Sequence, residues 1–110
     1  MQQEDCLFCK IVSGEIPAKK LLETTKVLAF HDLHPSAETH VLVVPKEHLG
    51  TFLDLTDDDL LSEMRQAIQQ VINTLGLSGA YRLVINGGKY QHVPHLHWHI
   101  LGGELQQPTP

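Results

Sequence analysis

The run HLHWHIL, residues 95–101, alternates histidine with apolar side chains and ends in an apolar pair. An alternation of period two predicts a β-strand, because successive side chains of a strand point to opposite faces of the sheet. We therefore place His95, His97 and His99 on one face and their apolar neighbours in a hydrophobic core. A slip of one residue would exchange the two sets, so the register of this strand is strongly fixed.

The sequence on either side predicts one long helix and several short strands. The helix begins at a cap on Thr56, carries acids at residues 57–59, where the helix dipole favours them, and ends at Gly76. Its apolar residues recur with helical spacing, which indicates either a helix that covers a sheet or a dimer seam. This combination predicts an α+β fold with a mostly antiparallel sheet. The other expected elements are a short helix over Cys9–Ser13 and strands over Lys19–Glu23, Val27–His31, His40–Val44 and Tyr81–Asn86.

Length and composition are those of a single globular domain. The chain has 110 residues, which we divide into a core of about residues 6–103 and a polar tail, 104–110. Its net charge of −5 argues against a protein that coats nucleic acid, but a local site can still bind a small anion. We find no secretory signal and no apolar run long enough for a membrane span, and two cysteines are too few for a disulfide framework. We therefore expect a cytoplasmic protein.

Four of the eight histidines lie between residues 92 and 99, which composition alone does not explain. Three imidazoles on one strand face are partly cationic near pH 7 and repel one another, so their presence needs a reason. One interpretation is a solvated, histidine-rich face. Another is one metal ion bound by all three, which their spacing of roughly 6.5 to 7 Å makes difficult. The third is a mixed site in which one neutral imidazole attacks phosphorus and a neighbour binds phosphate oxygens.

A second motif is CLFC, residues 6–9, whose two thiolates suit a structural zinc ion. Because the chain has no other cysteine, two histidines would have to complete the four ligands. A redox pair of the thioredoxin type is an alternative, although such a pair normally opens a helix after a strand, and none is expected before Cys6. Two cysteines without a special role are the remaining interpretation.

The run at residues 95–101 fits the pattern His-φ-His-φ-His-φ-φ, in which φ is apolar, of the histidine triad (HIT) superfamily. The chain resembles the Hint branch of that superfamily, the histidine triad nucleotide-binding proteins, over nearly its whole length. The resemblance implies a HIT fold and a homodimer with a continuous central sheet. The segments that carry it are FHDL, residues 30–33, THVLVVPKEH, residues 39–48, YRLVIN, residues 81–86, and LGG, residues 101–103.

The resemblance also implies an activity, the hydrolysis of purine nucleoside phosphoramidates such as adenosine 5'-phosphoramidate to AMP. His97 would attack the α-phosphorus and form a covalent nucleotidyl-histidine, and His99 would contact the phosphate. Asp32 would accept hydrogen bonds from the ribose hydroxyls, for which a carboxylate is suited. Phe30 and Leu33 would contact the base, and Asn86 would contact the phosphate. His40 would support the triad.

Members that keep the C-x2-C motif bind zinc, and the resemblance assigns the four ligands to Cys6, Cys9, His48 and His95. Such a zinc ion would be structural, because all four of its positions are filled. His95 would then hold the metal and leave the other two triad histidines for chemistry. No organic cofactor is implied.

The loop at residues 87–94 departs from the branch, because it is short and carries His92 where a serine is usual. An imidazole there could donate a proton to the leaving amine, or it is an ordinary surface histidine. Two other functions remain open. One is a dinucleoside polyphosphate hydrolase, although that branch has glutamine where this chain has His99. The other is a non-catalytic nucleotide- or zinc-binding module that acts through a protein partner.

Overall fold

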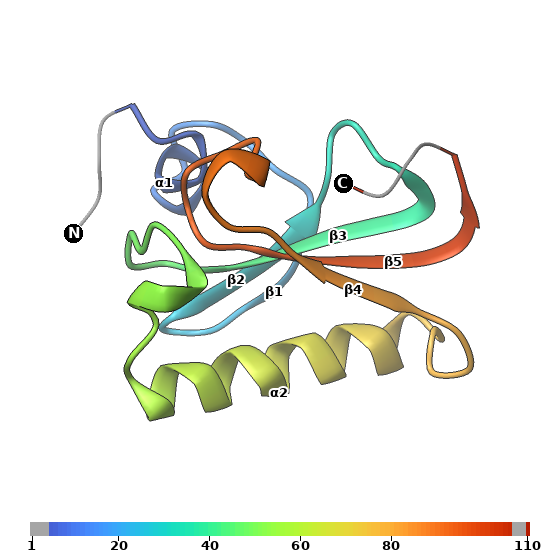
Figure 1. The fold of residues 1–110 in the computed structure, drawn as a ribbon. Helices are drawn as coiled ribbons and strands as arrows, with labels where there is room; N and C mark the ends of the chain where they lie inside the picture. The colour runs from blue at the N-terminus through green and yellow to red at the C-terminus, as the bar shows by residue number, and fades with distance from the viewer. Residues whose placement is uncertain (1–4, 107–109) are drawn as a thin grey trace.

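The computed structural model of the protein describes residues 5–106 and 110. In chain order its elements are α1 Leu7–Val12, β1 Lys20–Glu23, β2 Val27–His31, β3 Ala37–Pro45, the 3-10 turn η1 Phe52–Asp54, α2 Asp58–Thr74, β4 Arg82–Ile85, η2 Gly88–Tyr90 and β5 Trp98–Leu105. The strands form one antiparallel sheet in the order β1-β2-β3-β5-β4, with α2 across one face and α1 on the other (Figure 1). The predicted α+β fold is confirmed. Within the described residues, no helix has the length and apolar character needed to cross a membrane.

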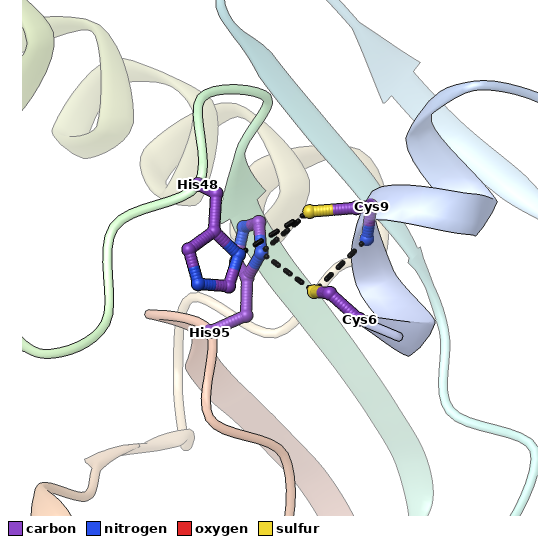
Figure 2. A group of neighbouring side chains, drawn as sticks. All are labelled: Cys6, Cys9, His48 and His95. Carbon is purple, nitrogen blue, oxygen red and sulfur yellow. Dashed lines mark hydrogen bonds between the residues drawn. The ribbon is translucent and has the colours of Figure 1, made fainter. Parts of the chain in front are cut away.

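The face of the sheet beneath α1 carries a small apolar cluster beside the histidines. Alternate apolar residues of β2 and β3 point to this side and pack against Phe8 and Ile11 of α1. Cys6 caps α1, because its sulfur accepts a hydrogen bond from the Cys9 N–H (3.3 Å). The helix therefore starts earlier than the predicted Cys9–Ser13. Figure 2 shows that both cysteines then face two histidines from distant parts of the chain.

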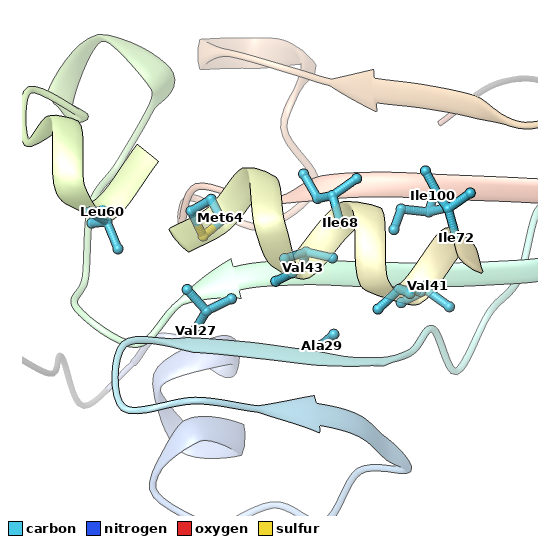
Figure 3. Packing of buried hydrophobic residues seen from close by; sticks show 11 residues of the cluster. Val27, Ala29, Val41, Val43, Leu60, Met64, Ile68, Ile72 and Ile100 are labelled. Atoms are coloured by element: carbon cyan, nitrogen blue, oxygen red, sulfur yellow. The ribbon is translucent and has the colours of Figure 1, made fainter. Parts of the chain in front are cut away.

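The opposite face is covered by α2, whose apolar stripe is buried against the sheet as predicted for a covering helix. Asp57, and not the predicted Thr56, caps this helix, because its carboxylate accepts hydrogen bonds from the N–H groups of Asp59 (2.9 Å) and Leu60 (3.3 Å). Gly76 follows the helix with a φ of +71°, a conformation that suits glycine. The core between helix and sheet includes Val27, Ala29, Val41, Val43, Met64, Ile68, Ile72 and Ile100 (Figure 3).

The histidine-bearing strand β5 starts and ends later than predicted. Its pairing with β3 begins only at Val43 and Trp98. Before that point the Leu96 N–H donates to the carbonyl of Leu49 (2.7 Å), which lies beyond the end of β3, and does not enter the ladder. The first two triad histidines therefore precede the strand, and the prediction of a regular strand from residue 95 is wrong.

The other strands lie close to their predicted bounds. β2 is as predicted, and β1 lacks only Lys19. β3 is longer than predicted at both ends, whereas β4 excludes Tyr81 and Asn86. Of the tail 104–110, residues 107–109 lie outside the described part of the chain.

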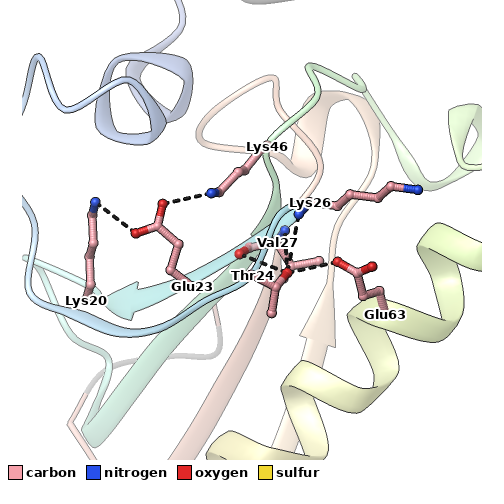
Figure 4. A network of polar contacts seen from close by, with 7 residues as sticks. All are labelled: Lys20, Glu23, Thr24, Lys26, Val27, Lys46 and Glu63. Carbon is pink, nitrogen blue, oxygen red and sulfur yellow. Dashed lines mark hydrogen bonds and ion pairs between the residues drawn. The ribbon is translucent and has the colours of Figure 1, made fainter.

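The two edges of the sheet differ in character. At the β1 edge, Glu23 forms ion pairs with Lys20 (3.3 Å) and Lys46 (2.7 Å), and Thr24 donates to Glu63 of α2 (2.8 Å; Figure 4). Charged side chains oppose pairing of an edge with another strand, whereas apolar ones favour it. The β4 edge instead carries exposed apolar side chains, namely Tyr81, Leu83 and Ile85.

The close approach of Gly103 to β3 yields a stability prediction. Gly103 has a φ of +73°, and a Cβ there would lie 2.8 Å from the Cβ of Glu38. We expect Gly103→Ala to lower the free energy of unfolding by about 1–2 kcal/mol, because a side chain is strained in this conformation. Urea unfolding measures the change. Gly79→Ala is the matched control, since Gly79 has open space and no positive φ, and an equal loss in both variants would contradict the prediction.

Candidate functional site

Four histidines are buried on the α1 side of the sheet. His40, His95, His97 and His99 are each at most 4% exposed. Burial penalises the charged imidazole and lowers the pKa of all four, to about 4 for His95 and to about 3 for His99. These rings are therefore neutral at pH 7. The expectation of partly cationic imidazoles is wrong, and so is the interpretation of the triad as a solvated face.

The tautomer of His97 follows from its hydrogen bond to the backbone. Its Nδ1 lies 2.6 Å from the carbonyl oxygen of His95. Because a carbonyl only accepts, Nδ1 carries the proton, and Nε2 of the neutral ring keeps its lone pair. The Phe8 ring packs edge-on against this imidazole, with centroids 5.0 Å apart and an interplanar angle of 82°. His97 is thus a fixed, neutral imidazole with one free lone pair, which is what a nucleophile requires.

A chain of hydrogen bonds sets the proton of His99 in the same way. The N–H of Ser36 donates to His40 Nδ1 (2.9 Å), so the proton of the neutral His40 ring lies on Nε2. That Nε2–H donates to His99 Nδ1 (2.8 Å), which leaves the proton of His99 on its own Nε2. Among the described residues this Nε2 is the buried side-chain atom without a partner. A buried donor without a partner is costly, so it is suited to a ligand oxygen.

Asp32 stands beside this chain at the end of β2. Its Oδ2 lies 3.4 Å from His40 Nε2, and its Oδ1 accepts from the N–H of His34 (2.9 Å). Asp32, His40 and His99 are close enough together for a metal ion. However, the Ser36 N–H uses the Nδ1 lone pair of His40, so a metal on Nε2 would require the ring to lose its second proton. We interpret the three residues as a hydrogen-bonded chain and not as a metal site.

A cavity of about 560 Å³ opens over these groups. Its polar end holds most of the predicted chemistry, because Asp32, His40, His92, His97 and His99 all line it. Its apolar end was missed by the sequence analysis, although two of its residues stand between the cysteines of the CLFC motif. The apolar lining residues are Leu7, Phe8, Leu42, Val93 and Pro110.

Three residues with predicted nucleotide contacts do not line this cavity. Phe30 is buried behind Phe8, with ring centroids 5.7 Å apart. Leu33 is 72% exposed just after Asp32. Asn86 is half-buried directly after β4.

A separate cluster joins Cys6, Cys9, His48 and His95 (Figure 2). The Nδ1 atom of His95 lies 3.2 Å from the Cys6 sulfur and 3.6 Å from the Cys9 sulfur, and His48 Nδ1 lies 3.3 Å from the Cys9 sulfur. Ligands of a tetrahedral zinc ion are about 3.3–3.8 Å apart when the bonds are about 2.3 Å to sulfur and about 2.0–2.1 Å to nitrogen. The four residues therefore fit a closed zinc site. The CLFC spacing suits zinc, and the resemblance assigns these four residues as its ligands.

Neighbouring groups affect how His95 and Cys6 could bind zinc. Nε2 of His95 donates to the Pro45 carbonyl (2.9 Å), so the lone pair of the neutral ring is on Nδ1, which faces the cysteines. Burial raises the pKa of the Cys6 thiol to about 11, so its thiolate needs a nearby cation. Both cysteines are free thiols.

Comparisons with known proteins agree on one family. The model of the HIT domain matches residues 13–106. A HIT-like protein of Methanocaldococcus jannaschii is 43% identical over 100 residues, 87% of this chain and 77% of that protein. An adenosine 5'-monophosphoramidase of Candida albicans is 39% identical over 105 residues, 87% and 68% of the two chains. The solved structure of a HIT family hydrolase from Legionella pneumophila matches with a TM-score of 0.85 and 43% identity, covering 96% of this chain and 99% of that one.

The depressed pKa of His99 predicts an acid-sensitive fold. Below its ordinary pKa of 6.5 the unfolded chain binds a proton at His99, whereas the folded chain does so only near pH 3, so stability falls as the pH drops from 6.5. We expect His99→Gln to reduce the loss of unfolding free energy between pH 7.5 and 5 by about 1–2 kcal/mol. Urea unfolding at both pH values tests this. His34→Gln, at an exposed position, is the control, and identical pH dependence in the two variants would refute the assignment.

Proposed function

We propose that this protein hydrolyses purine nucleoside phosphoramidates and releases AMP. The premise is that the chain belongs to the HIT domain family, whose model matches residues 13–106 and whose members include hydrolases. One observation carries the proposal: a free imidazole lone pair on His97 and an unpartnered buried N–H on His99 belong to the same cavity. The phosphoramidase activity named for the similar Candida albicans protein supports this substrate class.

In the proposed reaction, His97 Nε2 attacks the α-phosphorus and the P–N bond breaks. The amine leaves with a proton, and a nucleotidyl-histidine remains. Water then attacks the same phosphorus and the P–Nε2 bond breaks, which releases AMP and restores the imidazole. The proton that water loses replaces the one given to the amine. The His95 carbonyl, already hydrogen-bonded to His97 Nδ1–H, stabilises the positive charge that the substituted ring acquires. The Nε2–H of His99 donates to a non-bridging phosphate oxygen.

The rest of the cavity suits a nucleoside. We assign the base to the apolar end, formed by Leu7, Phe8 and Leu42, with Phe30 as support behind Phe8. The Asp32 carboxylate accepts from the ribose hydroxyls. His92, which lines the cavity from the shortened loop, donates the proton to the amine. Contacts of Leu33 with the base and of Asn86 with the phosphate remain part of the proposal.

We also propose that Cys6, Cys9, His48 and His95 hold a structural zinc ion. The ligand distances and the lone pair directed by Pro45 support this. Bound zinc supplies positive charge that keeps both sulfurs as thiolates, and it has no open position for a substrate. Thiolate ligands persist in a reducing compartment, which is consistent with the proposed cytoplasmic location.

A second copy of the chain is the proposed occupant of the β4 edge. Leu83 and Ile85 there are 43% and 38% exposed, and an apolar groove of about 550 Å³ separates the strand from α2. Antiparallel pairing of two β4 strands would continue the sheet from one copy into the other and bury this groove. The chain would then be a homodimer.

The proposed nucleophile predicts a large loss of activity. We expect His97→Ala to reduce AMP release from adenosine 5'-phosphoramidate by about a thousandfold or more, because no other group forms the covalent intermediate. His31→Ala, which changes a histidine outside the cavity lining, should keep its activity.

Three results would contradict the proposal. Full turnover by His97→Ala would exclude this nucleophile. A wild-type chain that binds AMP without turnover would be a binding module, and one that cleaves diadenosine polyphosphates faster would be a polyphosphate hydrolase.

The proposed pairing of two β4 strands can be tested by a charge substitution at that edge. We expect Leu83→Lys to yield a monomer in sedimentation equilibrium, because two like charges would meet at the paired edge. Leu53→Lys, at an 87% exposed position on η1, should sediment as the wild type does. A monomeric wild type, or a Leu83→Lys variant that stays dimeric, would rule out this interface.

A further inference from the structure

The proposed nucleophile lies outside the β-ladder. The cross-strand pairs of β5 begin at Trp98, with Val43 on one side and Ile85 on the other. His97 therefore has no ladder partner to hold its backbone. A nucleophile needs a fixed orientation, and misplacement of a reacting group by about 1 Å can cost on the order of a hundredfold in rate. Contacts other than the sheet must supply that orientation.

Three such contacts surround His97. Its Nδ1–H donates to the His95 carbonyl (2.6 Å), which fixes the tautomer. The N–H of the preceding Leu96 donates to the Leu49 carbonyl (2.7 Å), which fixes the backbone. The Phe8 ring lies edge-on against the imidazole, with centroids 5.0 Å apart, and this contact limits rotation of the ring.

Each of these contacts comes from a segment that holds a residue of the zinc cluster. Phe8 stands between Cys6 and Cys9 in α1, and Leu49 directly follows His48. The carbonyl that binds His97 belongs to His95, which is itself the fourth member. The cluster brings together three segments that are far apart in the sequence, because His48 is 39 positions after Cys9 and His95 is 89 positions after Cys6. Figure 2 shows the three segments converging on the four side chains.

We propose that the Cys6–Cys9–His48–His95 cluster positions His97, because it holds in place the carbonyl, the backbone partner and the aromatic ring that orient this imidazole. The proposal rests on the function above insofar as His97 is the nucleophile. The cluster residues act through His97 and are positioning residues. When the cluster lacks its ion, the three segments separate, the Nδ1–H bond loosens, and Nε2 holds a proton for part of the time.

The test compares two substitutions of His48, which neither lines the cavity nor contacts His97 in the described structure. His48→Ala removes one ligand. His48→Cys replaces it and leaves three cysteines and one histidine, which is also a common zinc set. Metal analysis gives the zinc content of each variant, and ¹⁵N NMR of the histidine rings reports the tautomer of His97 without any need for turnover. AMP release then gives kcat and KM.

We expect the wild type and His48→Cys to contain zinc and to show His97 protonated at Nδ1 alone. His48→Ala should lose zinc, show a mixture of tautomers at His97 and lose about ten- to a hundredfold in kcat. An unchanged His97 tautomer in metal-free His48→Ala would overturn the proposal, even if kcat falls. If the wild type releases no AMP but the tautomer shifts as expected, the proposed function fails and the positioning stands.

Phe8→Leu keeps the test decisive if His48→Ala does not fold. This variant retains all four cluster residues and the apolar character of the site but loses the aromatic edge against His97. With full zinc content, it should show faster exchange of the His97 Nδ1 proton than the wild type. Wild-type exchange in Phe8→Leu would count against the positioning role.

Discussion

The antiparallel pairing of β3 with β5 is the interaction on which both faces of the molecule depend. Its register places Val41 opposite Ile100 on the α2 side, where both enter the main core. The same register places Leu42 opposite His99 on the α1 side. One ladder therefore fixes a hydrophobic core and the buried imidazoles of His40 and His99 at once. A change in either face would have to be accommodated through the other, because alternate residues of the same two strands supply both.

Burial keeps these imidazoles neutral, and backbone groups decide which nitrogen of each neutral ring carries the proton. An imidazole can carry its proton on either nitrogen, whereas a peptide N–H always donates and a carbonyl always accepts. The Ser36 N–H, the Pro45 carbonyl and the His95 carbonyl each contact one ring and thereby decide the tautomers of His40, His95 and His97. The tautomer of His40 in turn decides that of His99. A free lone pair, a hydrogen-bond donor and a proposed metal ligand thus arise from chemically identical side chains.

Sequence patterns predicted which side chains share a face of a helix or strand. They did not predict features that depend on contacts between distant segments. The stripe on α2 and the position of His99 on the sheet face opposite Ile100 follow from helical and strand periods, and both were predicted. The irregular backbone before Trp98 was not, because the Leu96 N–H is captured by a loop that no local pattern connects to it. The neutral state of the triad was also missed, since it depends on α1 covering the histidines. The place of Leu7 in the apolar wall could have been inferred, because a residue between Cys6 and Cys9 must lie near the histidines with which these cysteines cluster.

The charged β1 edge of the sheet limits how many chains can join edge to edge. Glu23, flanked by Lys20 and Lys46, occupies the strand furthest from β4, and the backbone register is irregular beside it. When two chains join through their β4 strands, the outermost strand at each end of the combined sheet is β1. Both ends then present fixed charges and a disturbed ladder to any further chain. In the proposed dimer, growth would therefore stop at two copies, and an open-ended, fibril-like array of these sheets would be disfavoured.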